Sequence, residues 1–241
     1  MKLLPTLLLL ASLAAQAQTN EVLPTINTEL KRDSSAMMPY ALINEVLTKL
    51  GQYGEGLFRM DFKVDTATTK IPLDSLRMAI ASEDAYLPIK IGPDGAFELP
   101  VLPLAQAKTA DLATNAAKGQ VSVQGTLELT VPPEQLDMAK VRRIMRLSHK
   151  LKSELLPWYV RWLFPHIGGV VICADEPKYE LEWREGGQLL GLPLPADEKD
   201  PRAKEGAKGR TCALLTGAER WPDSARLVSP PNTQLSIKLG N

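Results

Sequence analysis

The sequence has few of the residues on which common catalytic and metal sites depend. It contains two histidines and two cysteines among 241 residues. Any Ser-His-Asp triad or histidine-rich metal site would therefore have to use His149 or His166. The patterns Gly-x-Ser-x-Gly, Ser-x-x-Lys, His-Glu-x-x-His and the phosphate-binding Walker loop are all absent. We therefore predict no catalytic residue, no metal ligand and no cofactor, and we disfavour an enzyme without excluding one.

The chain also lacks an excess of charge of either sign. Its 28 basic residues balance 28 acidic residues. A chain without net charge has no overall field that would draw it to nucleic acid or to an anionic surface. We therefore expect no nucleic-acid partner, and any electrostatic contact must come from a local cluster.

Long apolar runs are missing except at the N-terminus. The run from Leu3 to Ala15 is shorter than the roughly 20 residues that a membrane-spanning helix needs. It follows Met1-Lys2 and ends in Ala15-Gln16-Ala17, the pattern of a secretory signal peptide. No cysteine follows at once to carry a lipid anchor. The sequence predicts cleavage near Ala17 and a periplasmic or secreted protein with no transmembrane segment in the mature chain.

The only cysteines, Cys173 and Cys212, both follow the predicted signal peptide. An oxidising compartment favours a disulfide between two such residues, and neither has the Cys-x-x-Cys spacing of a metal or redox pair. We expect one disulfide that closes a loop of about 40 residues and contributes about 3 to 4 kcal/mol.

The remaining chain indicates an α+β fold of antiparallel β-sheets with packed helices. Nineteen prolines favour short strands and turns over a helical bundle. From Pro39 onward the pattern goes through one order of elements twice, which suggests an internal duplication. Each pass has a helix, a strand, a hairpin with a glycine turn, a Leu-Pro pair, a Lys-Gly pair and a second strand. The first pass has its helix at 40–50, strands at 57–64 and 120–129, and its hairpin turn at 92–95; the second has its helix at 134–156, strands at 170–173 and 210–215, and its hairpin turn at 186–187.

Matching the two passes predicts the domain organisation. We expect a signal peptide at 1–17, an extended lead at 18–38, a first α+β module at 39–133 and a second module with the disulfide at 134–241. The matching places Leu99-Pro100 opposite Leu192-Pro193. It also places Cys173 opposite Met60 and Cys212 opposite Ser122, so Met60 and Ser122 should face each other on neighbouring strands. The alternative is a pair of tandem immunoglobulin-like β-sandwiches linked by a helix at 134–165.

One stretch of the first pass resembles a known pattern. Gly95-Ala96-Phe97-Glu98-Leu99-Pro100, followed by Ala113-Thr114-Asn115-Ala116-Ala117-Lys118-Gly119, is similar to the G-x-x-x-LP … TNxPKG pattern of an uncharacterised family of secreted proteobacterial proteins. Ala117 stands where those proteins often have proline. The resemblance implies a periplasmic location and carries no activity.

A basic and aromatic segment at 134–166 is the strongest candidate for a binding surface. An apolar stripe that runs from Ile144 to Trp158 at helical spacing is flanked by lysines and arginines, and four aromatic residues follow within 158–164. Such a segment is typical of a helix that lies on an anionic membrane surface. The alternative is that the stripe packs on a sheet and the aromatic residues fill the core. The surface or partner contacts that we predict are Arg142, Arg143, Arg146, Lys150, Trp158 and Trp162.

These observations favour a non-enzymatic binding or scaffold protein of the cell envelope. Its partner would be an envelope lipid, a cell-wall polymer or another protein. The alternative is a periplasmic hydrolase of unfamiliar type, which requires a deep cleft near His166. Exposed aromatic residues beside the arginines favour the first function, and a polar cleft at His166 favours the second.

Overall fold

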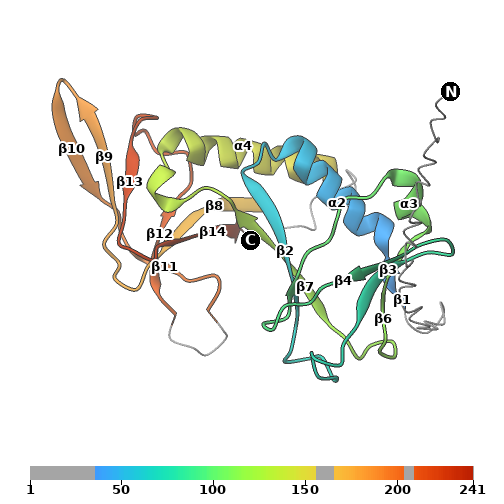
Figure 1. Cartoon of the computed structure of the whole chain (residues 1–241). Helices are drawn as coiled ribbons and strands as arrows, with labels where there is room; N and C mark the ends of the chain where they lie inside the picture. The colour runs from blue at the N-terminus through green and yellow to red at the C-terminus, as the bar shows by residue number, and fades with distance from the viewer. Residues whose placement is uncertain (1–35, 156–165, 204–208, 241) are drawn as a thin grey trace, which may run out of the picture.

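The computed structural model describes residues 36–155, 166–203 and 209–240, which form a mixed α+β fold of helices and antiparallel sheets (Figure 1). We refer to residues 36–132 as the first half and to residues 133–240 as the second half. The elements of the first half are β1 (Ala36–Pro39), α2 (Tyr40–Tyr53), β2 (Phe58–Val64), β3 (Met78–Ala81), β4 (Tyr86–Ile89), β5 (Ala96–Phe97), α3 (Leu104–Thr109), β6 (Asp111–Thr114) and β7 (Val123–Leu129). Those of the second half are η1 (Pro133–Gln135), α4 (Met138–Leu155), β8 (His166–Cys173), β9 (Glu180–Glu185), β10 (Gln188–Pro193), β11 (Glu198–Lys199), β12 (Thr211–Leu215), β13 (Arg226–Val228) and β14 (Gln234–Gly240).

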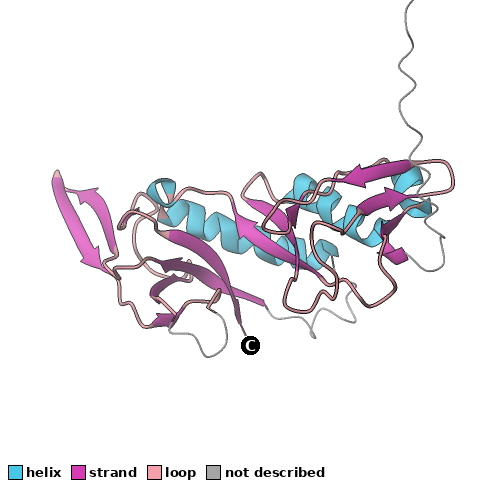
Figure 2. Ribbon diagram, turned by 60° about the horizontal axis from the view of Figure 1, so that its bottom comes forward, coloured by secondary structure: helices cyan, strands magenta, loops and turns pink. Residues whose placement is uncertain are grey.

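Each half contributes two sheets, and α4 runs along the molecule above the sheets (Figures 1 and 2). In the first half the strand orders are β1-β6-β3-β4 and β5-β2-β7. In the second half they are β10-β9-β13 and β11-β12-β8-β14. Across the described residues, no helix combines the length and the apolar character needed to cross a membrane.

The same order of strand pairing occurs in both halves. After the helix comes a central strand, β2 or β8, and then a hairpin, β3-β4 or β9-β10. Apart from the short β11, which pairs with β12, the next strand, β5 or β12, pairs with the central strand. The one after it, β6 or β13, pairs with the hairpin, and the last one, β7 or β14, covers the other edge of the central strand. The helix starts are also tied alike: Tyr40 N–H donates to Ala110 C=O at 2.9 Å, and Met138 N–H donates to Ala225 C=O at 2.9 Å.

This pairing corrects the detailed match between the halves that the sequence suggested. β2 and β7 are neighbours as expected, but Met60 faces Leu127, and the Ser122 carbonyl accepts a bond from the Asp65 N–H. The prediction that Met60 faces Ser122 is therefore wrong. Cys212 lies on β12, which pairs with β8 as β5 pairs with β2. The alignment through Lys-Gly pairs failed because these pairs precede strands that are not equivalent: Lys118-Gly119 precedes β7, whereas Lys208-Gly209 precedes β12.

The turn predicted at 92–95 forms, but its flanks do not make a hairpin. Gly95 has a φ of +85° and its N–H donates to Gly92 C=O at 2.9 Å. β4 pairs with β3, however, and β5 pairs with β2 in another sheet. The hairpin predicted in the second half is confirmed as β9-β10, because Gly186 and Gly187 both adopt the positive φ that a two-residue hairpin loop needs.

α4 starts later than the sequence pattern indicated, and its start has a defined cap. The predicted helix began at residue 134, where the structure has the short η1 turn. Asp137 then accepts a bond from the Lys140 N–H at 2.8 Å, which satisfies one of the free amide groups at a helix N-terminus. The buried face of α4 consists of Met138, Val141, Ile144, Leu147, Ser148 and Leu151.

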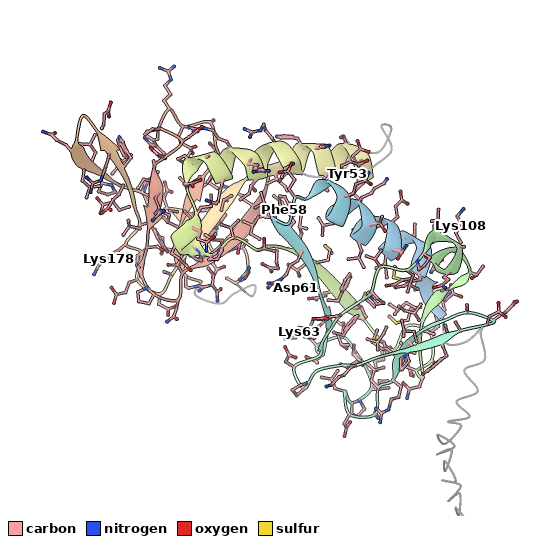
Figure 3. The ribbon with its side chains drawn as sticks, turned by 45° about the horizontal axis from the view of Figure 1, so that its top comes forward. Tyr53, Phe58, Asp61, Lys63, Lys108 and Lys178 are labelled. Atoms are coloured by element: carbon pink, nitrogen blue, oxygen red, sulfur yellow. A yellow bond between two sulfur atoms is a disulfide. The ribbon has the colours of Figure 1, made fainter. Side chains whose placement is uncertain are left out.

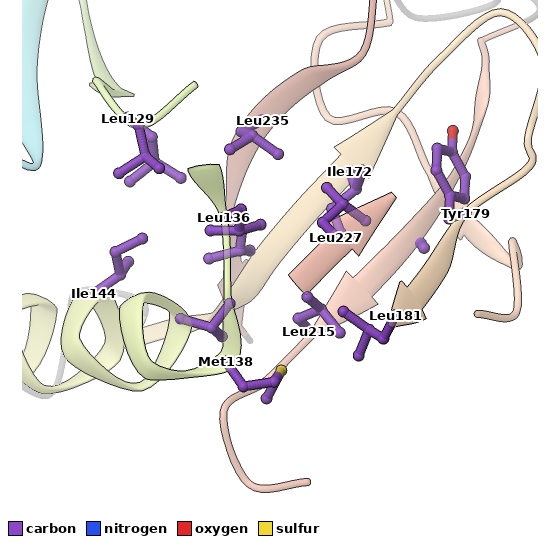
Figure 4. Close-up of a cluster of buried hydrophobic side chains, with 14 of the residues drawn as sticks. Leu129, Leu136, Met138, Ile144, Ile172, Tyr179, Leu181, Leu215, Leu227 and Leu235 are labelled. Atoms are coloured by element: carbon purple, nitrogen blue, oxygen red, sulfur yellow. The ribbon is translucent and has the colours of Figure 1, made fainter. Parts of the chain in front are cut away.

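The main hydrophobic core lies under α4 and draws on both halves (Figure 4). Ile144 and Met138 from α4 meet Ile172 from β8 and Leu215 from β12, and all but one of the labelled side chains in Figure 4 belong to the second half. Leu129 is the exception. The first half adds its core residues Leu50, Phe58, Leu129 and Val131 to this cluster. A second cluster, which includes Tyr40 and Leu112, fills the first half.

The burial of Tyr40, at the start of α2, can be tested by unfolding at alkaline pH. The side chain has no exposed surface, and its hydroxyl donates to Pro100 C=O at 2.5 Å. Burial raises the pKa of Tyr40 from 10.0 to about 12. Because the folded pKa is the higher one, the stabilisation is complete below pH 10 and is lost as the pH rises through about 12. We expect urea unfolding at increasing alkaline pH to show this loss, and Tyr40→Phe to show less of it at a cost of about 1 kcal/mol at neutral pH. An equal alkaline loss in both proteins would contradict this assignment.

The predicted disulfide is present, on the face of the β8 sheet that points away from α4. Cys173 and Cys212 face each other on β8 and β12 with their Cα atoms 4.4 Å apart. Side chains alternate along β8. Val170 and Ile172 point into the main core, whereas Val171 and Cys173 form a small cluster with Cys212 on the opposite face. The strand is therefore buried on both sides.

Candidate functional site

α4 carries a concentrated positive charge, as the sequence indicated. Among its residues from Met138 to Leu155, Glu154 is the only acidic one and six are lysine or arginine. Because the apolar stripe packs on the core, the basic side chains must lie on the flanks and on the outer ridge of the helix. Their contacts differ, and these differences decide which of them are available to a partner.

Arg142 is a structural residue. Its guanidinium donates to three carbonyl groups of the loop after β12: Gly217 at 3.3 Å, Glu219 at 2.6 Å and Trp221 at 2.8 Å. It also forms an ion pair with Asp223. A guanidinium with several aligned donors suits such a set of acceptors. The predicted surface contact Arg142 therefore holds a loop of its own half onto α4.

Arg143 and Lys150 face the first half. Arg143 pairs with Glu55, a residue with a φ of +51° in the turn between α2 and β2. The Lys150 Nζ lies 4.8 Å from the centre of the Tyr53 ring, close enough for a cation–π contact. Tyr53 stands at the end of α2 beside α4, as Figure 3 shows. Both side chains thus contact the first half, but both are largely exposed, and their outer sides remain accessible.

Arg146 lies at the centre of the exposed ridge. It is one turn from Arg142 and Arg143 on one side and one turn from His149 and Lys150 on the other. Among the described residues its side chain has neither an ion pair nor a hydrogen bond, and both Arg146 and His149 are exposed. We define Arg143, Arg146 and Lys150 as the α4 ridge.

The aromatic part of the predicted site cannot be placed. Trp158 and Trp162 lie outside the described residues, which stop at Leu155 and resume at His166. Their expected position beside the arginines stays a prediction. The structure does bring the predicted cations together along one helix, and it separates Arg142 from the rest by its hydrogen bonds.

Sequence reasoning missed a second polar cluster, which lies over the disulfide. After β11 the chain turns across the outer face of the β8 sheet, and the Asp200 carboxylate lies within 4.8 Å of both cysteine sulfurs. The Asp200 side chain is 6% exposed and pairs with Arg210 at 2.9 Å. Arg202 pairs with Glu128 of β7 and donates to Leu235 C=O of β14 at 3.1 Å. Because the two cysteines are bonded to each other, the cluster is no metal site. Through Arg202 and Glu128 it joins the two halves.

Glu198 adds a pH-sensitive contact to this cluster. It forms an ion pair with Lys238 of β14. The hydrogen bond from Lys238 holds the pKa of Glu198 below its ordinary value of 4.5. Because the folded pKa is the lower one, this contact stabilises the fold above the ordinary pKa and is lost as the pH falls through the depressed one.

His166, the residue on which the hydrolase alternative depends, lies at the first position of β8 opposite Gly240. It is exposed, and within the described part of the chain its side chain has neither a hydrogen bond nor an ion pair. A hollow of about 630 Å³ lies elsewhere in the second half, between the start of β9 and the end of β13, where Pro177, Pro193, Pro230 and Pro231 line it.

Comparison with known proteins identifies no relative for this chain. No family model, no curated protein and no solved structure matches it.

Proposed function

We propose that this chain is a non-enzymatic binding or scaffold protein of the bacterial cell envelope, and that the α4 ridge is its contact surface for anionic groups. The observation that carries the proposal is Arg146, which is exposed between Arg143 and Lys150 on one helix face and has no ion pair with any residue that the structure describes. Like charges one turn apart repel each other and destabilise a helix, so an anionic partner would relieve this repulsion. The N-terminal signal pattern supports the periplasm as the location, where phosphate groups of lipids are within reach.

We infer that the protein consists of two copies of one α+β module, and we prefer this to tandem β-sandwiches. The recurring pairing order and the matching helix starts support the inference. So does a short sequence match near the start of the last strand, where Gln120-Val121-Ser122-Val123, which leads into β7, corresponds to Gln234-Leu235-Ser236-Ile237 in β14. In both modules this segment follows the strand that pairs with the hairpin.

Neutralising the α4 ridge tests the proposed contact. In the triple variant Arg143→Gln, Arg146→Gln, Lys150→Gln, we expect affinity for vesicles rich in phosphatidylglycerol to fall about tenfold. Each cation near an anionic surface contributes about 1 kcal/mol, and the contacts of Arg143 and Lys150 with the first half reduce their share. Vesicle sedimentation at low and physiological salt measures the change, and the wild-type affinity should weaken with salt. Arg142 is left intact because its loss would disturb the fold.

A control variant separates a local site from overall charge. Lys90→Gln, Lys108→Gln, Lys118→Gln removes the same charge from exposed positions of the first half. It should bind the vesicles as the wild type does. Equal loss in both variants, or equal binding to neutral and anionic vesicles, would refute the α4 ridge as the contact surface.

A further inference from the structure

The turn between α2 and β2 holds one residue in an uncommon backbone conformation. Glu55 has a φ of +51°, in the left-handed region that glycine adopts readily and that costs free energy for a residue with a side chain. It lies between two glycines. A Cβ on Gly54 would clash with the Leu50 carbonyl oxygen, and Gly56 has a φ of +70°. The backbone of this turn would therefore favour a third glycine at position 55.

The shape of the turn does not depend on the Glu55 side chain. The Gly54 N–H donates to Leu50 C=O at 2.8 Å, which closes the end of α2. The Thr130 hydroxyl donates to Gly56 C=O at 2.5 Å, which ties the turn to the end of β7. The Glu55 carboxylate takes part in neither bond. The turn can therefore keep its shape when this side chain is changed.

The Glu55 carboxylate reaches α4 instead. It accepts a hydrogen bond from the Arg143 Nε–H at 2.5 Å and forms an ion pair with the guanidinium. The Glu55 and Arg143 side chains are 43% and 56% exposed, and an ion pair so open to water contributes little to stability. Tyr53 and Phe58, which flank the turn, lie beside α4 (Figure 3), and Phe58 belongs to the core that both halves share. The ion pair thus offsets little of the cost of the left-handed backbone, and the shared core holds the halves together.

The effect of Glu55 on the α4 ridge is a loss of positive charge. Of the three ridge cations, Arg143 alone forms an ion pair with a described residue. Lys150 lies against the Tyr53 ring, which has no net charge and leaves the ammonium group positive. Arg146 is exposed, without an ion pair in the described part of the chain. An anion that approaches Arg143 must therefore compete with the Glu55 carboxylate, whereas it meets no such competitor at Lys150.

We propose that Glu55 is an internal competitor of the anionic partner at Arg143, so that the α4 ridge of the free protein is partly autoinhibited. This inference rests on the function proposed above. Binding of a phosphate group to Arg143 breaks the ion pair with Glu55, and the freed carboxylate then lies beside the anionic surface. Both effects lower the affinity of the ridge. The backbone conformation of Glu55 fits this role, because strained residues concentrate where a contact serves function.

Replacing Glu55 with glutamine in the full chain tests the competition. In Glu55→Gln we expect the affinity for vesicles rich in phosphatidylglycerol to rise about fivefold, because Arg143 becomes free and one negative charge is lost. The gain should fall to about twofold when Arg143→Gln is already present, since only the repulsion between Glu55 and the vesicle then remains. Glu154→Gln, at an exposed position one turn after Lys150, is the matched control for charge and should also gain no more than about twofold.

Replacing Glu55 with glycine separates this regulatory role from a structural one. Glu55→Gly removes the carboxylate and also the side chain that the left-handed backbone disfavours. The vesicle affinity should rise as in Glu55→Gln, while the urea midpoint of unfolding stays the same or rises. A residue that fastened the two halves together would instead lower the midpoint when removed.

The outcomes distinguish this inference from the proposed function. If the wild type binds anionic vesicles through the α4 ridge but Glu55→Gln gains no more than Glu154→Gln, the function stands and the competition is refuted. An equal gain with and without Arg143, or a lowered midpoint in Glu55→Gly, would refute the competition in the same way. If the wild type does not bind anionic vesicles, the proposed function and this inference are both wrong.

Discussion

Replacing Arg142 with methionine is expected to lower the free energy of unfolding by about 3 kcal/mol. The change keeps the apolar stem of the side chain and removes the guanidinium. The carbonyls of Gly217, Glu219 and Trp221 then lose a charged donor, and the loss of such a bond costs about 1.5 to 3 kcal/mol where water does not replace it. Asp223 is 70% exposed, so its ion pair adds little. Urea unfolding followed by far-UV circular dichroism measures the shift.

Two companion variants show whether the carbonyl contacts are the cause. Arg142→Lys keeps the charge but has no planar fork for several carbonyls, so it should recover only part of the loss. Arg146→Gln, one turn along the exposed face of the same helix, should change the stability by less than about 0.5 kcal/mol. If Arg142→Met and Arg146→Gln had the same stability, the structural role of Arg142 would be wrong.

Removing the disulfide is expected to cost about 3 kcal/mol. The cysteines are 39 residues apart in the sequence, and the bond limits the freedom of the unfolded chain between them. In the double variant Cys173→Ala, Cys212→Ala, the unfolded chain gains this freedom while the folded sheet loses only two small buried side chains. We expect a lower urea midpoint and a steeper dependence on urea, because the freed unfolded chain exposes more surface.

The reduced wild type is the control for this variant. Reduction under unfolding conditions should lower its stability to about that of the double variant. The folded protein should resist the same reductant, since Cys173 is 1% exposed and Cys212 is fully buried. An unchanged midpoint in the double variant would show that the bond adds nothing to stability.

Features set by a few adjacent residues were predictable from the sequence. The pair Gly186-Gly187 between apolar stretches specified the β9-β10 hairpin, because few other residues adopt its loop conformation. The stripe at Ile144 and Leu147 specified the buried face of α4. The two cysteines had only each other as partners. Each of these predictions depended on local geometry or, for the disulfide, on there being only one possible pairing.

Features that depend on the meeting of distant residues were not predictable. The turn at Gly92 and Gly95 is correct in shape, yet a turn does not determine whether its flanks join one sheet or two. The stretch that contains Asp200 and Arg202 is polar and reads as a solvated loop, but Arg202 contacts β7, 74 residues earlier, and β14 beyond. No pattern within this stretch indicates that it lies at the junction of the two halves.

In the candidate site, too, local features were predictable and contacts between distant residues were not. A row of lysines and arginines on a helix predicts a basic face, and the structure places Arg143, Arg146 and Lys150 on it. Nothing near Arg142 in the sequence distinguishes it from its neighbours, because its acceptors lie in a loop after β12, between Gly217 and Asp223. A variant that neutralised Arg142 together with Arg143 and Arg146 would confuse lost stability with lost binding.

The shared core determines when this protein can finish folding as its chain emerges N-terminus first. Leu50, Phe58, Leu129 and Val131 emerge with the first half, and their packing partners on α4 and β8 follow later. Until those partners arrive, the early part of the chain presents an uncovered apolar strip. The two halves therefore cannot complete their folding as independent units. We expect a chain that ends at the junction to aggregate.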